Sequence, residues 1–482
     1  MAFIRKVKTG SGATAIQIAH KLYGRIVKIE HLGSAHSDDE QKLLIDIARK
    51  RLLGNQQSLF KDYPSAVKIG LKQTVSALLF QLLSSQYNHL GFSKLNDDIF
   101  ADLVLARLVE PTSKLDSLRI LTELGITGFG KDQLYRCLQQ IIHKDYRHTI
   151  TDCCFAYAQP FGLSLVLYDV TTLYFEIQKE DDYRKSGLSK ERRLEPQIII
   201  GLLVNQSGFP LQLQSFEGNK AEAKTILPVI EEFKRQHQLP NITVVADAGM
   251  LSSGNLTALE DAGYSYIVGS RLNKIPYDIA QYQQRSKLLD HQIITSAISQ
   301  SKRIIYQYRA KRAQLDLRNI EKAKSKAERV ISGQIRTKRS RFVSVKESRL
   351  QLNQKLIDKA QALIGIKGYV TNLAVPDEQV INYYHQLWHV EQSFRMSKSD
   401  LKARPIFHHK QDSIEAHLTI VLAALAVAKL VEDKTGMSIK RFIQTLRPIR
   451  SGIVTLNGKE YPAEAELSTE VKNIVRKLQP GY

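Results

Sequence analysis

The sequence predicts an α/β protein with a mixed sheet, preceded by a mostly helical region and interrupted by a basic segment. Three observations predict this class. Short runs rich in β-branched and aromatic residues flank an amphipathic helix after residue 163, apolar residues recur at helical spacing before residue 158, and positive charge is concentrated in residues 301–350. The chain has 482 residues, of which 43% are hydrophobic, which is enough for two to four domains.

The N-terminal part predicts a hairpin followed by helices. Residues 13–33 alternate polar and apolar residues around Gly24, so we expect a β-hairpin within an N-terminal domain of residues 1–36. Residues 37–158 predict a helical domain, because 65–83 and 97–109 carry apolar residues at three-and-four spacing. Pro111 predicts the start of a further helix, since proline favours the first helical position. Short helices joined by tight turns are typical of DNA-end-binding helix-turn-helix domains and of helical packing domains, and both interpretations stay open.

The next part predicts the sheet. Strands are expected in 163–176, twice in 195–219 around a Ser-Gly turn, in 241–250, in 265–270 and in 364–373. An amphipathic helix is expected at 223–238 and a single helix over 377–400. The segment 413–432 is apolar on all sides, which is typical of a buried core helix. We assign 159–271 and 366–435 to one domain, 272–365 to a basic insertion and 436–482 to a C-terminal segment.

The charge of the chain points to nucleic acid as the partner. The formal net charge is +21 and the pI is near 9.6, which favours nucleic acid first and an anionic membrane second. The longest apolar run, Leu418 to Ala428, is shorter than the ~20 residues that a membrane-spanning helix needs, so we expect no membrane partner. The N-terminus lacks the apolar core of a signal peptide, and three cysteines suit a reducing compartment, so we expect a cytoplasmic protein.

The basic segment 301–350 contains 16 Lys or Arg against 4 Asp or Glu. Its helical portion shows no deep apolar stripe, so we expect it on the surface. A run of charge is often only a solvated face, but the single sign here favours binding to phosphate groups. The candidate DNA contacts on this helix are Lys311, Arg312, Lys322 and Lys324.

Two aspartates lie in the predicted strands. Asp169 lies in the strand LVLYDV, and Asp247 ends the strand VVADAG. Functional groups collect at the carboxyl ends of strands in α/β sheets, and a carboxylate that closes an apolar run costs free energy unless it is paired. The two aspartates therefore suggest a bound cation, for which Mg²⁺ suits carboxylate ligands. The alternative is that each aspartate caps the next turn or helix.

A third carboxylate lies in the predicted helix 377–400. Glu391, Arg395 and Lys398 share one helix face with Phe394, and Trp388 and Tyr384 continue this face toward the N-terminus. A metal-bound phosphodiester requires such a set: a carboxylate for the ion, cations for phosphate oxygens and an aromatic ring for an unstacked base. The alternative is a Glu391–Arg395 pair on a helix whose Trp388 and Phe394 lie in the core.

These residues resemble the DDE transposases of bacterial insertion sequences. The branch that the chain resembles most has the signature Tyr-x2-Arg-x3-Glu-x6-Lys. The signature corresponds here to Tyr384, Glu391 and Lys398, and Leu387 stands in place of the arginine. Arg395 lies one turn beyond the glutamate and can replace the missing phosphate contact. Trp388 matches a tryptophan three residues before the glutamate in related transposases. Further similar segments are DVTTLYFE, DAGMLSSGNLTALEDAGYSYIVGSRL, RPIFHHKQDSIEAHL and the N-terminal VKTGSGATAIQIAHK.

The resemblance implies an RNase H-like catalytic domain in which Asp169, Asp247 and Glu391 are catalytic and bind two Mg²⁺ or Mn²⁺ ions. The resemblance also implies that the protein cleaves insertion-sequence ends and transfers the strands. Its partner would be double-stranded DNA, at the transposon ends and at the target. It would act as a homodimer on the bacterial nucleoid. Two other functions remain open. One is another RNase H-like metal endonuclease, and the other is a non-catalytic DNA-binding protein derived from a transposase.

Overall fold

The computed structural model describes residues 2–10, 12–53, 69–128, 130–176, 179–187, 195–239, 242–250, 253–270, 287–335, 340–346, 349–404, 406, 408–456 and 458–479. The chain divides into two compact units. Unit 1 contains residues 1–70 and 454–461, and unit 2 contains residues 71–453 and 462–482.

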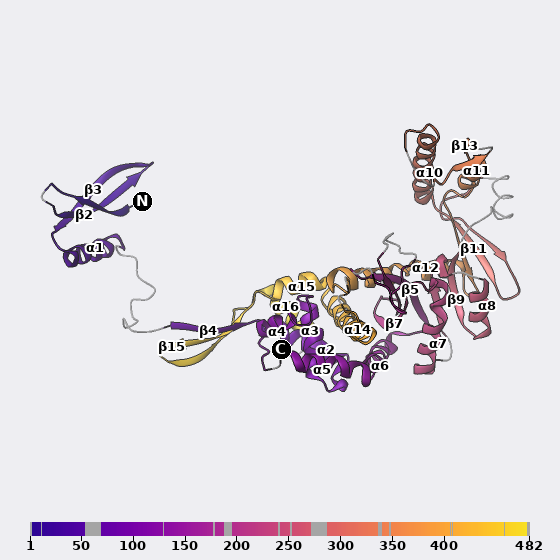
Figure 1. The fold of residues 1–482 in the computed structure, drawn as a ribbon, viewed down its shortest axis with the longest axis horizontal. Helices are drawn as coiled ribbons and strands as arrows, with labels where there is room; N and C mark the ends of the chain where they lie inside the picture. The colour runs from indigo at the N-terminus through magenta and orange to yellow at the C-terminus, as the bar shows by residue number, and fades with distance from the viewer. Residues whose placement is uncertain are drawn as a thin grey trace. The chain divides into compact units, whose positions relative to one another are not determined.

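Unit 1 contains a three-stranded antiparallel sheet of order β1-β2-β3 and one helix (Figure 1). The predicted hairpin is confirmed: β2 and β3 pair on either side of Tyr23 and Gly24, both with positive φ. Ile16 and Ile18 of the sheet pack with Ala48 of the helix. The elements are β1 (Ala2–Lys8), β2 (Thr14–Leu22), β3 (Arg25–Ala35) and α1 (Asp38–Leu53).

The predicted helix at 65–83 is only half correct. Residues 65–68 lie outside the described residues, and Ile69–Val75 forms strand β4. The helix begins only at Ala77, because Leu79, Leu82 and Leu83 are the residues that pack in the core. Strand β4 belongs to a three-stranded sheet of order β16-β15-β4, with β15 (Ser451–Leu456) and β16 (Lys459–Ala463).

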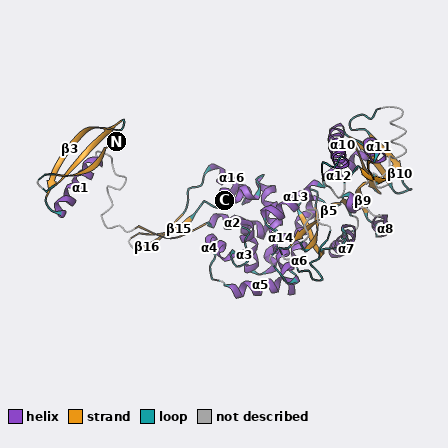
Figure 2. Ribbon diagram, turned by 45° about the horizontal axis from the view of Figure 1, so that its top comes forward, coloured by secondary structure: helices purple, strands orange, loops and turns teal. Residues whose placement is uncertain are grey.

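The helical part of unit 2 packs around one long helix, α14 (Gln411–Thr435), which contacts α2, α3, α5, α6, α15 and α16 (Figure 2). Among the described helices, α14 alone is long and apolar enough to cross a membrane, but 94% of its apolar window is buried inside the protein. The prediction of a buried core helix is therefore confirmed. The other helices are α2 (Ala77–His89), η1 (Phe92–Leu95), α3 (Asp98–Val109), α4 (Ser117–Leu124), α5 (Lys131–His143), α6 (Tyr146–Ala158), η2 (Gln159–Phe161), α15 (Ile439–Leu446) and α16 (Thr469–Leu478).

The prediction that Pro111 opens a helix is wrong. Helix α4 begins at Ser117, and the residues from Pro111 to Asp116 form a loop. The backbone N–H of Asp116 donates to Oγ of Ser113, and the ammonium group of Lys114 lies 3.3 Å from Nδ1 of His417 on α14. These contacts hold the loop against the core helix instead of allowing a first helical turn.

The sheet of unit 2 has eight strands in the order β10-β11-β14-β9-β8-β5-β6-β7. The central neighbours β5-β8 and β8-β9 are parallel and the other neighbours are antiparallel, so the predicted mixed α/β class is confirmed. The strands are β5 (Leu165–Tyr174), β6 (Gln197–Val204), β7 (Pro210–Glu217), β8 (Thr243–Ala246), β9 (Ser265–Ser270), β10 (Ile293–Ala297), β11 (Arg303–Tyr308) and β14 (Ile366–Thr371).

Helices pack against this sheet as two groups. One group contacts β6, β7 and β9 and comprises η3 (Glu222–Lys224), α7 (Ile226–His237), η4 (Ala248–Met250) and α8 (Ser253–Asp261). The other group contacts β5, β6, β8, β9 and β14 and comprises α12 (Asp377–His385) and α13 (Trp388–Arg395). The hydroxyl of Tyr168 on β5 donates to Thr225 beside α7, so the next residue, Asp169, faces the other side of the sheet.

The expected insertion 272–365 has two structural parts, and its residues 272–286 lie outside the described residues. Strands β10 and β11 extend the central sheet. A separate small core is formed by α10 (Ala310–Ile331), the hairpin of β12 (Val343–Lys346) and β13 (Arg349–Leu352), and α11 (Gln354–Ala362). Helix α10 has a narrow buried stripe of Ala313, Ile320, Ala327 and Val330, so the prediction that it lacks an apolar stripe is wrong. The stripe is hard to recognise in the sequence, because its first three residues are spaced seven apart and two of its four residues are alanine.

The predicted helix 377–400 is not continuous. Helix α12 ends at His385, α13 begins at Trp388, and a π-helical turn, η5 (Met396–Asp400), follows it. Leu387 in the break is buried in the core, and Ser393 of α13 donates a hydrogen bond to the backbone oxygen of Gly208. The break changes which side chains share a face, with consequences for the site.

Candidate active site

Asp169 and Asp247 lie side by side on neighbouring parallel strands. The register of β5 and β8 pairs Tyr168 with Ala246, and each aspartate is the next residue along its strand. Because residues in register in a parallel pair point to the same side of the sheet, the two aspartates share the face on which α12 and α13 pack. Asp169 lies in the middle of β5 and Asp247 directly follows the end of β8, so the two aspartates meet although only one of them ends its strand.

Glu391 reaches the same face from α13. Asp169 and Glu391 line one pocket of about 520 Å³, together with Phe394, Arg395 and Lys398. Glu391 is exposed and Asp169 is half-buried. The alternative pairing of Glu391 with Arg395 is not formed: within the described residues, the Glu391 carboxylate makes no hydrogen bond or ion pair. It is therefore available to a ligand.

Asp247 is held by helix α12. The hydroxyl of Tyr384 donates a hydrogen bond of 2.8 Å to Oδ1 of Asp247, and burial together with the Asp247 charge raises the pKa of Tyr384. Gly269 on β9 makes room for this contact, because a Cβ there would lie 2.5 Å from the Tyr384 hydroxyl oxygen. Tyr384 is only 4% exposed, so its role in the fold is to position Asp247 and not to present a ring to solvent.

A half-buried lysine, Lys367, lies at the pocket of Asp247. The ammonium group of Lys367 on β14 lies 4.2 Å from the ring centroid of Tyr384. Burial and the positive charge of Arg312 lower the pKa of Lys367, whereas the negative charges of Asp247 and Glu391 oppose this shift. Lys367 and Asp247 also line one pocket, which places this lysine beside the Asp247 carboxylate.

The three carboxylates do not line a single pocket. Asp247 lines a second pocket of about 500 Å³ with Tyr384, Lys367 and Arg312. Among the residues that the structure describes, no three His, Cys, Asp or Glu side chains are grouped closely enough to hold a metal ion. The donors themselves fit a hard divalent cation, since all three are carboxylates at accessible positions and Asp247 keeps its Oδ2 beyond the bond to Tyr384.

Cations surround the pocket of Asp169 and Glu391. Arg395 is exposed, Lys398 follows on the π-helical turn, and Arg404 lines the pocket from the segment after it. Arg404 also lies over the ring of Tyr174 on β5, with 5.4 Å between the guanidinium carbon and the ring centroid. Leu387, at the position where the resemblance expects arginine, is a core residue, so Arg395 is the cation of α13 that reaches this pocket.

Trp388 is not a core residue. It is 53% exposed and its ring lies 3.9 Å from that of His389, centroid to centroid. The break before α13 separates it from buried Tyr384, so the two residues do not form the continuous aromatic stripe that a single helix would give. Phe394, in contrast, is buried at 7% exposure.

The four candidate cations of α10 differ in their surroundings. Lys311, Lys322 and Lys324 are exposed. Arg312 is also exposed, but it forms an ion pair of 3.5 Å with Asp316 and lines the Asp247 pocket. It therefore belongs to the surroundings of the carboxylates, whereas none of the three lysines lines that pocket.

Sequence reasoning missed Lys367 and Arg404. Lys367 lies within the apolar strand IKGYVT, and a charged residue in such a strand could have been recognised as a buried functional candidate. Arg404 lies in the segment RPIFHHKQDSIEAHL, which the resemblance contains but whose cations were given no role. Both residues approach the carboxylates only through tertiary packing.

Comparison with known proteins places these residues in a family. Residues 160–427, more than half of the chain, match the family model described as transposase DDE domain. No curated protein sequence matches the chain. Among solved structures the chain is similar to piggyBac transposase in a synaptic complex with hairpin DNA, at 10% identity over 80% of this chain and 82% of that chain, with a TM-score of 0.42. It is also similar to Mos1 transposase in a paired-end complex with the left transposon end, at 14% identity over 47% and 66% of the two chains, with a TM-score of 0.17.

Proposed function

Because the chain belongs to the transposase DDE-domain family and acts in DNA transposition, we propose that Asp169, Asp247 and Glu391 are its three catalytic carboxylates. The observation that supports this proposal is that the three carboxylates reach the same face of the sheet. Asp169 and Asp247 follow the last register pair of two parallel strands, and α13 brings Glu391 to the pocket of Asp169. The strand order β7-β6-β5-β8-β9 supports an RNase H-like domain, with the two aspartates on its central strands.

The proposed reaction is metal-dependent cleavage and strand transfer of insertion-sequence ends. Two Mg²⁺ or Mn²⁺ ions at the three carboxylates would supply Lewis acidity to the attacking water or 3′-hydroxyl and to the leaving oxygen. Tyr384 fixes the orientation of Asp247 by its hydrogen bond. Arg395 and Lys398 neutralise phosphate oxygens beside the carboxylates, because both line the pocket of Asp169 and Glu391.

The proposed substrate is double-stranded DNA at the element's ends and at the target. The basic surface of α10 with Lys311, Lys322 and Lys324 supports contacts to the phosphate backbone without a choice of sequence. Trp388 offers an exposed ring at the start of α13, three residues before Glu391, on which an extruded base can stack. The signature residues Tyr384, Glu391 and Lys398 support the bacterial insertion-sequence branch. A homodimer on DNA and action at the nucleoid in the cytoplasm belong to the same proposal.

The experiment is strand cleavage of DNA that carries the element's terminal inverted repeats. Asp169→Ala, Asp247→Ala and Glu391→Ala are each expected to abolish cleavage while DNA binding and the melting temperature stay near those of the wild type. Asp182→Ala is the matched control, because this aspartate is fully exposed and lies outside both pockets. Cleavage at the wild-type rate by any one of the three variants would remove that residue from the site.

A further inference from the structure

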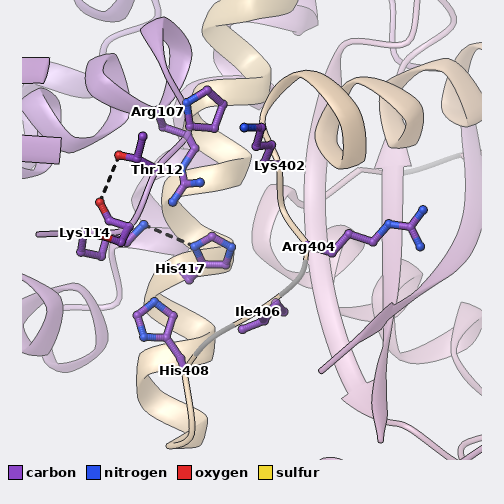
Figure 3. A pocket seen from close by; sticks show the side chains of 10 residues that line it. Arg107, Thr112, Lys114, Lys402, Arg404, Ile406, His408 and His417 are labelled. Carbon is purple, nitrogen blue, oxygen red and sulfur yellow. Dashed lines mark hydrogen bonds between the residues drawn. The ribbon is translucent and has the colours of Figure 1, made fainter. Parts of the chain in front are cut away.

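A third cavity, of about 270 Å³, lies between the loop before α4 and helix α14 (Figure 3). Its walls carry Arg107 from the end of α3, Lys114 from the loop, Lys402 from the segment before α14, and the rings of His408 and His417. Arg404 contributes to the wall, but its guanidinium group points away toward the sheet (Figure 3). The three basic side chains that remain come from three different segments of the chain, and burial together with the charge of Arg107 lowers the pKa of Lys114 well below its ordinary value.

The cavity is positively charged and lacks a compensating carboxylate. None of its lining residues is acidic. The acidic neighbours of the loop are engaged elsewhere, since Glu110 pairs with Arg119 and Arg447, and Asp116 pairs with Arg119. The charge of Arg107 is therefore not balanced by the acidic side chains nearest to it in the chain.

Arg107 carries its charge in a buried position. It is 6% exposed, and no hydrogen bond or ion pair joins its guanidinium group to another described residue. Burial lowers the pKa of Arg107 to about 10, so the group stays protonated at neutral pH. A buried charge without a partner costs several kcal/mol in proteins, which indicates that an anion compensates it.

The polar groups beside Arg107 are already hydrogen-bonded within the protein. The Nε2 of His417 lies 3.2 Å from the backbone oxygen of Ala403 and donates to it, which leaves Nδ1 to accept from Lys114 at 3.3 Å. Burial, Lys114 and Arg107 lower the pKa of His417 and lower that of His408 to about 4, so both rings are neutral at pH 7. The hydroxyl of Thr112, at the same wall, donates to the backbone oxygen of Ser113 at 3.2 Å.

Lys402 is held in a conformation that an L-residue rarely adopts. Its φ is 43°, in the left-handed region, where glycine is the favoured residue. A positive φ at a residue other than glycine costs backbone free energy. Here the strain places an ammonium group at the mouth of a cavity that already contains two cations, against their mutual repulsion.

We propose that this cavity is a binding site for a phosphate monoester, held by Arg107, Lys114 and Lys402. A dianionic tetrahedral group can accept from all three cations, and the cavity is large enough for the phosphate together with part of the molecule that carries it. The site contains neither Asp169, Asp247 nor Glu391, so it stands independently of the proposed catalytic residues.

The first test is the melting temperature of the full chain against the concentration of inorganic phosphate, at an ionic strength held constant with chloride. The wild-type melting temperature is expected to rise with phosphate, because a ligand that binds only the folded state stabilises it. Arg107→Met is expected to bind phosphate at least about tenfold more weakly. Arg476→Met is the matched control, since Arg476 is exposed on α16, and it should respond as the wild type does. An equal rise in Arg107→Met would overturn the proposal.

Lys402→Gly provides a variant that does not disturb the core, since Lys402 is exposed. It relieves the positive φ, so the ligand-free melting temperature should not fall, yet phosphate should bind more weakly. Gln238→Gly is its control, because Gln238 has a φ of 51° at the end of α7, far from the cavity in sequence. Unchanged phosphate affinity in Lys402→Gly would contradict the role of this lysine and with it the proposal.

The source of the phosphate is identified by comparing the binding of three ligands. A short 5′-phosphorylated oligonucleotide, the same oligonucleotide with a 5′-hydroxyl, and inorganic phosphate are titrated against wild type and Arg107→Met by isothermal titration calorimetry. If the wild type binds the 5′-phosphorylated oligonucleotide more tightly than the 5′-hydroxyl form, and Arg107→Met does not, the source of the phosphate is a DNA terminus. If Arg107→Met binds inorganic phosphate more weakly than the wild type but binds both oligonucleotides equally well, the source is a free phosphate. Equal binding of all three ligands by both proteins would overturn the proposal, and cleavage activity is measured separately with the alanine variants of the carboxylates.

Discussion

The hydroxyl of Tyr384 donates to Oδ1 of Asp247 across 2.8 Å and so joins helix α12 to the end of strand β8. Gly269 on the neighbouring strand leaves the space that this hydroxyl occupies. Because hydrogen-bond partners of this kind fix the orientation of a metal-binding carboxylate, the contact links the packing of a helix to the chemistry at the sheet.

We expect Tyr384→Phe to lower DNA cleavage about 10- to 100-fold, the usual cost of removing a partner that orients a metal ligand. The protein should lose only about 1 kcal/mol of stability, since the ring stays and one hydrogen bond is lost. Tyr369→Phe is the control, because its hydroxyl lies 3.4 Å from His385 Nε2 and, among the described contacts, makes no hydrogen bond to Asp169, Asp247 or Glu391. Equal activity of the two variants would show that Tyr384 does not position Asp247 for catalysis.

The exposed ring of Trp388 predicts an effect on one step of the reaction. Trp388→Ala should spare the first nick but impair the step in which a base leaves the stack, by about 1–3 kcal/mol. The stability cost should stay below about 1 kcal/mol, because the side chain is half exposed. Nicking, hairpin formation and melting temperature are measured on the same variant, and a substrate with an abasic site at the flipped position should partly restore the later step. An equal loss of all steps would contradict the stacking role.

The lysines of α10 predict a change in salt dependence. Replacing Lys311, Lys322 and Lys324 with Gln should weaken binding to all DNA sequences alike and reduce the slope of log K against log salt by about 0.9 for each lost contact. The control replaces three exposed lysines outside α10, Lys131, Lys440 and Lys472. An unchanged slope for the α10 variant would mean that this surface is only solvated. Arg312 is left intact because its ion pair with Asp316 lies at the Asp247 pocket.

Asp102 on α3 predicts a stability that depends on pH. Burial, with the charges of Asp98 and Asp97, raises the pKa of Asp102 to about 7 from an ordinary value of 3.8. The folded state therefore favours the protonated acid, and this contribution to stability is complete below pH 3.8 and is lost as pH rises through 7. Asp102→Asn should stabilise the protein at pH 8 by on the order of 1 kcal/mol after allowing for solvent screening, and less at pH 5. Thermal unfolding at both pH values checks this, with Asp182→Asn as an exposed control; a gain that is equal at both values would contradict it.

Local patterns predicted the elements of the sheet well. The strand SYIVGS is found at Ser265–Ser270, and the Ser-Gly turn joins β6 to β7. The two aspartates were identified because each is a charged residue in an apolar strand, a signal that exists within ten residues of sequence. Glu391 was identified because its neighbours on one helical turn are cations and rings.

Features that depend on tertiary contacts could not be predicted. Helical periodicity continues through Gln386 and Leu387, so nothing local predicted the break that buries Leu387 and turns Trp388 outward. Pro111 favours a helix start, but the contact between Lys114 and His417, 303 residues apart, keeps its loop open. The stripe of α10 became recognisable only with Phe342 and Ile357 packed near it.

The most direct test of the three-carboxylate site is the number of Mn²⁺ ions that the full chain binds in complex with DNA of the terminal repeats, measured by electron paramagnetic resonance. The wild type is expected to bind two ions, and Asp169→Asn, Asp247→Asn and Glu391→Gln should each bind fewer while still binding the DNA. Asp182→Asn should bind as the wild type does. Two ions retained in all three variants would contradict the assignment of these carboxylates to the metal site.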